Sequence, residues 1–218
     1  MSLTSEHEYV RTIHAIGGLA WENLDEQRCV EAAWAYYFFS VQFRENLLIA
    51  RRLHPGDDKL MDLERGECAT DNLSPWPGVA AAGEAMNHDE FMRRALLLSP
   101  LDPERQQDFA ERGEAYLYAT RAVHDAVRAM SIASYEDGGL EHVFEAMLRM
   151  PGSANPTVAA FRHFLSEHIR FDSNPDEGHG ALARHLMPDD RIKPLWDAFY
   201  DLLAAFVPSL TARETHTA

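Results

Sequence analysis

The sequence predicts an all-α protein on three grounds. Apolar residues recur at helical spacing along nearly the whole chain. No stretch of useful length alternates between apolar and polar residues as a half-buried strand does. Clusters of Pro and Gly interrupt the helical pattern at intervals, as the connections of a helical bundle do. The 218 residues therefore suit a single domain over 1–210, with about seven to nine helices, followed by a polar, frayed tail at 211–218.

Pro and Gly clusters bound the helices expected in the first half of the chain. His54-Pro55-Gly56-Asp57 ends a long helix, and Ser74-Pro75-Trp76-Pro77-Gly78 ends a shorter one. Thr4 and Ser5 can cap the first helix. The expected helices cover residues 4–20, 25–53, 58–73 and 79–98.

The second half begins with a strong start signal. Asp102 is a good helix cap, and Pro103 suits the first turn. The helix that follows is expected to continue to about Tyr135, where Gly138-Gly139 interrupts the pattern. Four further helices are expected over residues 140–149, 156–172, 176–186 and 189–206.

Charge and composition exclude several classes of function. The net charge is −15 and the only lysines are Lys59 and Lys193, which argues against nucleic acid or an anionic membrane surface as partner. Cys29 and Cys68 are too few for a disulfide scaffold. The chain lacks an apolar run of about 18 residues, and the first residues are polar and acidic, unlike a secretory leader. We therefore expect a cytoplasmic protein.

The most informative segment runs from His168 to His179. It holds two imidazoles and three carboxylates, two of which are Asp172 and Asp176. Histidine nitrogen combined with carboxylate oxygen is the ligand set of non-haem iron and related metals. A spacing of four puts His168 and Asp172 on one helix face, and a spacing of three does the same for Asp176 and His179. A solvated acidic helix end is the alternative interpretation.

A continuous helix through this segment would keep its histidines apart. His168 and His179 would lie roughly 16 Å apart along the axis, whereas two metals about 3.5–4 Å apart need ligands that converge. Pro175 disfavours a continuous helix. If the chain loops out around Pro175, Asp172 and His179 can converge; otherwise Asp176 takes the place of Asp172.

Three more candidates lie earlier in the chain. Glu67 is flanked by small residues, with Asp71 at a spacing of four; a salt bridge to an arginine is the more common role for such an acid. His88 falls in the first turn of an expected helix, where a structural histidine is the ordinary case. Glu136 follows small and apolar residues, and a role as a simple helix-terminal acid is disfavoured by the helix dipole.

Together these residues resemble the ligand pattern of the haem-oxygenase-like diiron oxidases. The resemblance covers residues 60–185, and its most specific part is the late His-x-x-x-Asp followed by a second His. It implies a metal-ligand set of Glu67, His88, Glu136, His168, Asp172 and His179, with Asp176 and Asp71 in reserve.

The resemblance also implies a fold and a reaction. The fold would be like that of haem oxygenase and the thiaminase-type TenA proteins. Two ferrous ions per chain would activate O₂ to oxidise a small substrate, a free aliphatic amino acid in natural-product biosynthesis, by desaturation, by C–N ring closure such as azetidine formation, or by N-oxygenation. Arg44, Arg93 or Arg121 could clamp a substrate carboxylate, although a surface ion pair is the more common role for each. An external electron donor and a homodimer are compatible with this interpretation.

Two alternatives come from other classes of function. One is a metal-free enzyme of the TenA or quinone-cofactor-forming type, in which carboxylates act as acid and base and Cys68 as nucleophile. The other is a helical binding protein without catalysis. Metal content after anaerobic loading with ferrous ion separates all three.

Overall fold

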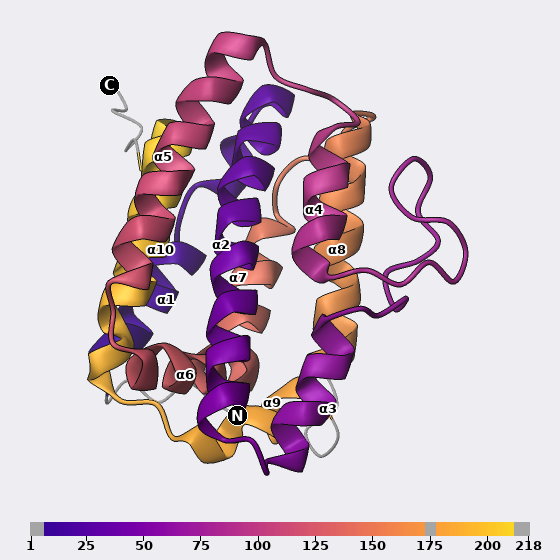
Figure 1. Cartoon of the computed structure of the whole chain (residues 1–218). Coiled ribbons are helices and arrows are strands. Elements are labelled where there is room, and N and C mark those ends of the chain that lie inside the picture. Colours follow the sequence, from indigo (N-terminus) through magenta and orange to yellow (C-terminus); the bar gives the residue numbers. More distant parts are fainter. Residues whose placement is uncertain (1–6, 173–177, 212–218) are drawn as a thin grey trace.

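Helices make up the regular secondary structure of the computed structural model, which describes residues 7–172 and 178–211. The predicted all-α fold is therefore confirmed (Figure 1). The α-helices are α1 (Glu8–Gly17), α2 (Glu26–Leu53), α3 (Asp58–Glu67), α4 (His88–Leu96), α5 (Pro103–Arg121), α6 (Asp125–Ser134), α7 (Leu140–Met147), α8 (Pro156–Asp172), α9 (His179–Ala183) and α10 (Lys193–Phe206). Short helical segments are η1 (Trp21–Asn23), η2 (Tyr135–Gly139), η3 (Arg184–Leu186), η4 (Asp190–Ile192) and η5 (Pro208–Leu210).

Helix α2 runs through the middle of the bundle, between α4 and α8 on one side and α5 and α10 on the other (Figure 1). It begins as expected, because the Asp25 side chain accepts a hydrogen bond of 2.8 Å from the Arg28 backbone N–H. Its buried residues lie on all sides of the helix, which is the pattern of a helix enclosed by others. The other helices thus share one core around α2.

Two expected helices of the first half are shorter than predicted. The helix expected over 58–73 ends at Glu67, because Cys68 is extended and Ala69 adopts a left-handed backbone (φ 51°). The helix expected over 79–98 begins only at His88. Between them, residues 68–87 form a long connection that protrudes from the bundle beside α8 (Figure 1).

The helix expected over 102–135 is two helices in a different arrangement. Helix α5 ends at Arg121, and α6 starts where the His124 ring accepts a hydrogen bond of 3.2 Å from the Ala126 N–H. Helix α6 then lies across one end of the bundle (Figure 1). It continues into the π-helical segment η2, in which Asp137 (ψ 57°) and Gly138 (φ 92°) leave helical geometry.

The remaining boundaries differ little from expectation. Helix α8 covers residues 156–172 as predicted. The helix expected over 4–20 is α1, within 8–17, and that expected over 189–206 is η4 and α10. The described part of the helix expected over 176–186 is α9 and η3. Within the described residues, none of the helices has the length and apolar character that crossing a membrane requires.

A glycine lets α5 pack tightly on α2. A Cβ added at Gly113 would lie 2.2 Å from atoms of the Phe38 ring. Phe38 is buried, and its ring packs against Phe206 of α10 at a centroid distance of 6.1 Å. The ring therefore has little freedom to move away.

We predict that Gly113→Ala destabilises the protein although alanine favours helix. The helix propensity gained is about 1 kcal/mol, whereas overpacking a core contact costs about 1–3 kcal/mol. Denaturant unfolding monitored by circular dichroism should show a lower free energy of unfolding. Gly56→Ala, whose Cβ would meet nothing within 4 Å, is the matched control. Equal stability of the two variants would contradict the close packing.

Candidate metal centre

Five predicted ligand side chains come together from five different elements. Glu67 is the last residue of α3, His88 the first of α4 and His179 the first of α9. Glu136 comes from η2 and His168 from α8. Glu67, His88, Glu136 and His168 are only 5–6 % exposed, and the His179 side chain is 12 % exposed. Residues more than 100 positions apart thus meet in one buried place.

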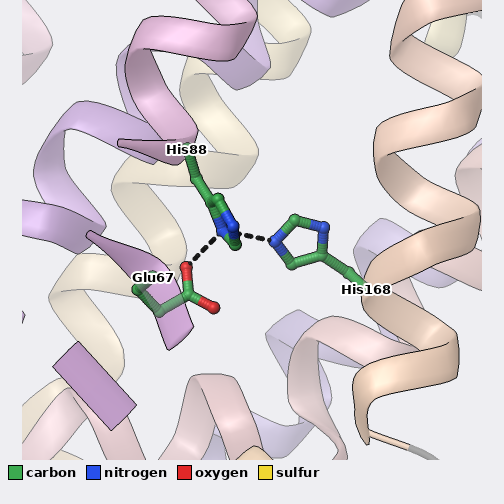
Figure 2. A group of neighbouring side chains, drawn as sticks. All are labelled: Glu67, His88 and His168. Atoms are coloured by element: carbon green, nitrogen blue, oxygen red, sulfur yellow. Dashed lines mark hydrogen bonds and ion pairs between the residues drawn. The ribbon is translucent and has the colours of Figure 1, made fainter. Parts of the chain in front are cut away.

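The first ligand group consists of Glu67, His88 and His168 (Figure 2). His88 Nδ1 lies 2.6 Å from Glu67 Oε2 and 2.9 Å from His168 Nε2. All three ligand atoms lie within 4.8 Å of one another. A single proton on His88 Nδ1 can satisfy only one of its two neighbours, whereas one metal ion can accept lone pairs from all three atoms.

The second ligand group consists of Glu67, Glu136 and His179. His179 Nδ1 lies 3.2 Å from Glu67 Oε1 and 3.3 Å from Glu136 Oε2. Glu67 belongs to both groups, and it presents Oε2 to the first and Oε1 to the second. A carboxylate shared in this way is placed to bridge two ions.

The orientation of His168 is set from outside the group. Its Nδ1 lies 2.8 Å from the backbone carbonyl oxygen of Phe164. A carbonyl only accepts hydrogen bonds, so Nδ1 carries the proton and donates it, and Nε2 presents its lone pair to the group. This arrangement is the usual support of a metal-binding histidine.

Electrostatics keep two of these groups in the protonation states that bind metals. Burial by itself would raise the pKa of Glu67, but the charges of His88 and His179 outweigh it and lower the pKa to about 2. Burial and the neighbouring His88 lower the pKa of His168 to about 3, so its imidazole is neutral. Burial raises the pKa of Glu136 against the effect of His179. A cation at the second group would oppose that rise.

A small cavity adjoins the ligand residues. Its volume is about 20 Å³, which suits about one water-sized species. Tyr36, Phe43 and Phe164 form much of its apolar wall. Besides the ligand residues Glu67, His88, Glu136 and His168, the lining contains the charged side chains of Arg44 and Asp89, which pair with each other at 2.9 Å.

Only Arg44 of the three arginine candidates lines the cavity. Arg93 pairs with Glu90, and Arg121 pairs with Glu45, both at 2.6 Å. Arg93 and Arg121 thus form ion pairs with residues outside the cavity lining.

Of the remaining candidate ligands Asp71, Asp172 and Asp176, the structure describes the side chain of Asp71 alone. Asp71 does not share a helix face with Glu67, because α3 ends at Glu67 and Asp71 is exposed in the connection that follows. The expectation that Asp71 shares a helix face with Glu67 is therefore wrong, and Asp71 belongs to neither ligand group. Asp176 and the side chain of Asp172 lie outside the described residues. His168 and His179 do lie on separate helices, as convergence of their rings requires.

Sequence reasoning missed two residues that shape the site. A Cβ added at Gly66 would lie 2.9 Å from His179 Nε2, so this glycine makes room for the ring. Asn72 contacts His88 Nε2 through Oδ1 at 2.9 Å. No local pattern marks Asn72, because its role depends on how the connection 68–87 folds back on α4.

In comparisons with family models, curated protein sequences and solved structures, nothing matches the chain. The candidate site therefore stands on the geometry and chemistry of its own residues.

We predict that Glu67→Gln lowers metal binding more than loss of either outer histidine. The amide is neutral and cannot bridge two cations, whereas His168→Ala and His179→Ala each leave the other ligand group intact. Metal per chain, measured after anaerobic ferrous loading and removal of free ion, should fall from about two toward zero for Glu67→Gln, and by at least one ion for each histidine variant. Circular dichroism serves as the folding control. Retention of both ions by Glu67→Gln would rule out the shared carboxylate.

We also predict that Gly66→Ala selectively weakens the second ligand group. The new methyl group would displace the His179 ring, whereas the contacts of His88 with Glu67 and His168 do not involve that ring. Loading should drop by one ion while the other is retained. Gly152→Ala, with open space around its Cβ, is the control. Loss of both ions, or of neither, would contradict this assignment.

Proposed function

We propose that the protein is a non-haem diiron enzyme that activates O₂ to oxidise a small substrate. The observation that carries the proposal is the buried carboxylate of Glu67, which offers one oxygen to each of two ligand groups. The choice of iron and O₂ draws on the resemblance of the ligand pattern to that of the haem-oxygenase-like diiron oxidases.

A cation explains the buried carboxylates better than a structural salt bridge. Among the described residues, the ion pairs of Glu67 and Glu136 are with histidines. One of the imidazoles around Glu67, that of His168, is held neutral. Two carboxylates buried around the same His179 nitrogen are costly unless further positive charge compensates them. A pair of divalent ions supplies that charge.

The donor atoms favour a first-row metal with open positions. The first group holds two histidines and one carboxylate, the donor set of many non-haem Fe(II) oxygenases. Both groups offer nitrogen and oxygen donors without a thiolate. Among the described residues, each group supplies three protein atoms, fewer than a first-row ion commonly binds, so a bound ion could also take O₂ or substrate.

The protein residues around the site would control access and charge. Bound ferrous ions would supply electrons and a binding position for O₂. Tyr36, Phe43 and Phe164 would keep bulk water from the site. The Arg44–Asp89 pair lines the same cavity as the ligand residues, and we assign it to the carboxylate and ammonium of an amino-acid substrate. A cavity of about 20 Å³ is too small for an amino acid, so substrate binding requires these walls to move apart.

The metal-free alternative is less well supported. Burial, reinforced by the charge of Glu67, raises the pKa of Cys68 to about 12. The thiol would then be protonated at neutral pH and a poor nucleophile. A binding protein without catalysis would have no need for five converging ionisable side chains in its interior.

Anaerobic reconstitution followed by exposure to O₂ tests the proposal. We expect about two ferrous ions per chain and, in stopped-flow mixing with O₂, a transient visible absorption that one member of a panel of aliphatic amino acids accelerates. His168→Ala should abolish the transient. Loading of one ion or none would reject the dinuclear centre. If two ions bind but no amino acid alters the O₂ reaction or is consumed, the substrate class is wrong and fatty or aromatic acids become the next panel.

A further inference from the structure

We propose that Arg184 is a positioning residue for the second ligand group, because its pair with Asp137 holds α9 against η2. Glu136 directly precedes Asp137 in η2, and His179 is the first residue of α9. Arg184 directly follows α9, as the first residue of η3. The inference rests on the proposed metal centre and adds two residues that the ligand pattern does not contain.

Helix α9 and η2 approach each other at the level of the backbone. A Cβ added at Gly180 would lie 3.0 Å from the carbonyl oxygen of Glu136 and 3.2 Å from the Cα of Asp137. Gly180 is buried, and it is the residue next to His179. Because the two segments touch beside both ligands, a slide or tilt of α9 over η2 would move the His179 ring relative to the Glu136 carboxylate.

The ion pair fixes the angle of this approach as well as its distance. Arg184 Nε donates a hydrogen bond of 3.0 Å to Asp137 Oδ2, and Nη2 donates one of 2.9 Å to Oδ1. Two parallel hydrogen bonds between planar groups add a geometric specificity that a single contact lacks. Asp137 is also a residue at which η2 leaves helical geometry, with ψ 57°. The guanidinium therefore holds the irregular turn that presents Glu136.

The second ligand group depends on this restraint more than the first. His179 Nδ1 lies 3.2 Å from Glu67 Oε1 and 3.3 Å from Glu136 Oε2. Bonds from nitrogen and oxygen ligands to an ion such as zinc are about 2.0–2.2 Å long, and the groups of a binding site need to be held within about 0.5 Å of their working geometry. A larger shift of α9 would take His179 away from an ion held by the two carboxylates. The first group draws its ligands from α3, α4 and α8 instead.

The pair contributes more to orientation than to global stability. The Arg184 side chain is 46 % exposed and that of Asp137 is 17 % exposed, and ion pairs near the surface contribute little to the free energy of unfolding. His185 Nε2 lies 2.5 Å from Asp57 Oδ2, which attaches the same segment to the start of α3. Without Arg184 the segment would thus remain attached, but its orientation against η2 would no longer be set.

Five variants separate this role from general loosening of the fold. Arg184→Gln and Asp137→Asn each remove the pair, and a double variant combines them. Arg184→Lys keeps the charge but cannot reproduce the planar two-bond geometry. Arg112→Gln is the matched control. Arg112 is 48 % exposed and donates hydrogen bonds to Asp108 of its own helix α5 and to the carbonyl oxygen of Ala205 in α10, and neither helix carries a ligand.

Two measurements are made on each variant. The first is hydrogen exchange of the metal-free protein, read by mass spectrometry over residues 178–186 and over α4. The second is an anaerobic titration with Co²⁺ that gives the affinity of each of two ions. We expect Arg184→Gln to exchange faster over 178–186 but not over α4. It should bind one Co²⁺ about 10–100-fold more weakly and the other as tightly as wild type.

The remaining variants test whether the pair itself is responsible. Asp137→Asn should behave like Arg184→Gln, and the double variant should be no weaker than either, because residues that act through one shared contact do not have additive effects. Arg184→Lys should fall between wild type and Arg184→Gln. Arg112→Gln should match wild type in exchange over 178–186 and in both Co²⁺ affinities.

The outcomes keep this inference distinct from the proposed function. Equal weakening of both ions, or additive losses in the double variant, would overturn it, since the fold in general rather than the pair would then matter. Unchanged exchange over 178–186 in Arg184→Gln, or two unchanged affinities, would also overturn it while the metal centre stands. If wild-type protein binds no Co²⁺, the proposed function fails, and the exchange comparison still decides whether Arg184 holds α9 in place.

Discussion

The buried carboxylate of Glu67 is the group on which the architecture of the site depends. It lies 2.6 Å from a nitrogen of His88 and 3.2 Å from one of His179, and it is almost completely removed from water. A carboxylate in that position is costly unless positive charge and hydrogen-bond donors surround it. Elements that are distant in sequence therefore have to deliver their histidines to the same place.

That requirement explains why helices begin and end at the site. Glu67 ends α3, while His88 and His179 begin α4 and α9. Breaks in the helices let short elements approach from several directions, which one long helix could not do. Close approach also needs small residues: a Cβ at Gly180 would lie 3.0 Å from the carbonyl oxygen of Glu136. The site is thus assembled where backbones come unusually near each other.

The π-helical segment η2 has a comparable role for Glu136. π-Helical turns are rare and often occur at functional sites. Here the neighbouring Tyr135 is anchored in the core, with its hydroxyl 2.9 Å from Gln42 Nε2 of α2 and its ring 5.0 Å from that of Trp196 of α10. Trp196 in turn donates a 3.0 Å hydrogen bond to Ser134. These contacts tie the irregular turn to both helices and hold Glu136 toward the ligand groups.

The sequence by itself determined the helical class, the bounds of the long helix α2 and of α8, and the chemical type of the candidate ligands. These follow from periodicity, from caps such as Asp25 and from side-chain chemistry, which are local properties of the chain. Only the tertiary structure decided that Glu67, His88 and Glu136 meet, because nothing local encodes contacts between distant segments. It also decided that α3 stops at Glu67 and that residues 79–87, although rich in alanine, are not helical. There, contacts of the connection 68–87 with α4 and α8 override local helix propensity, which exposes Asp71 and brings Asn72 to His88.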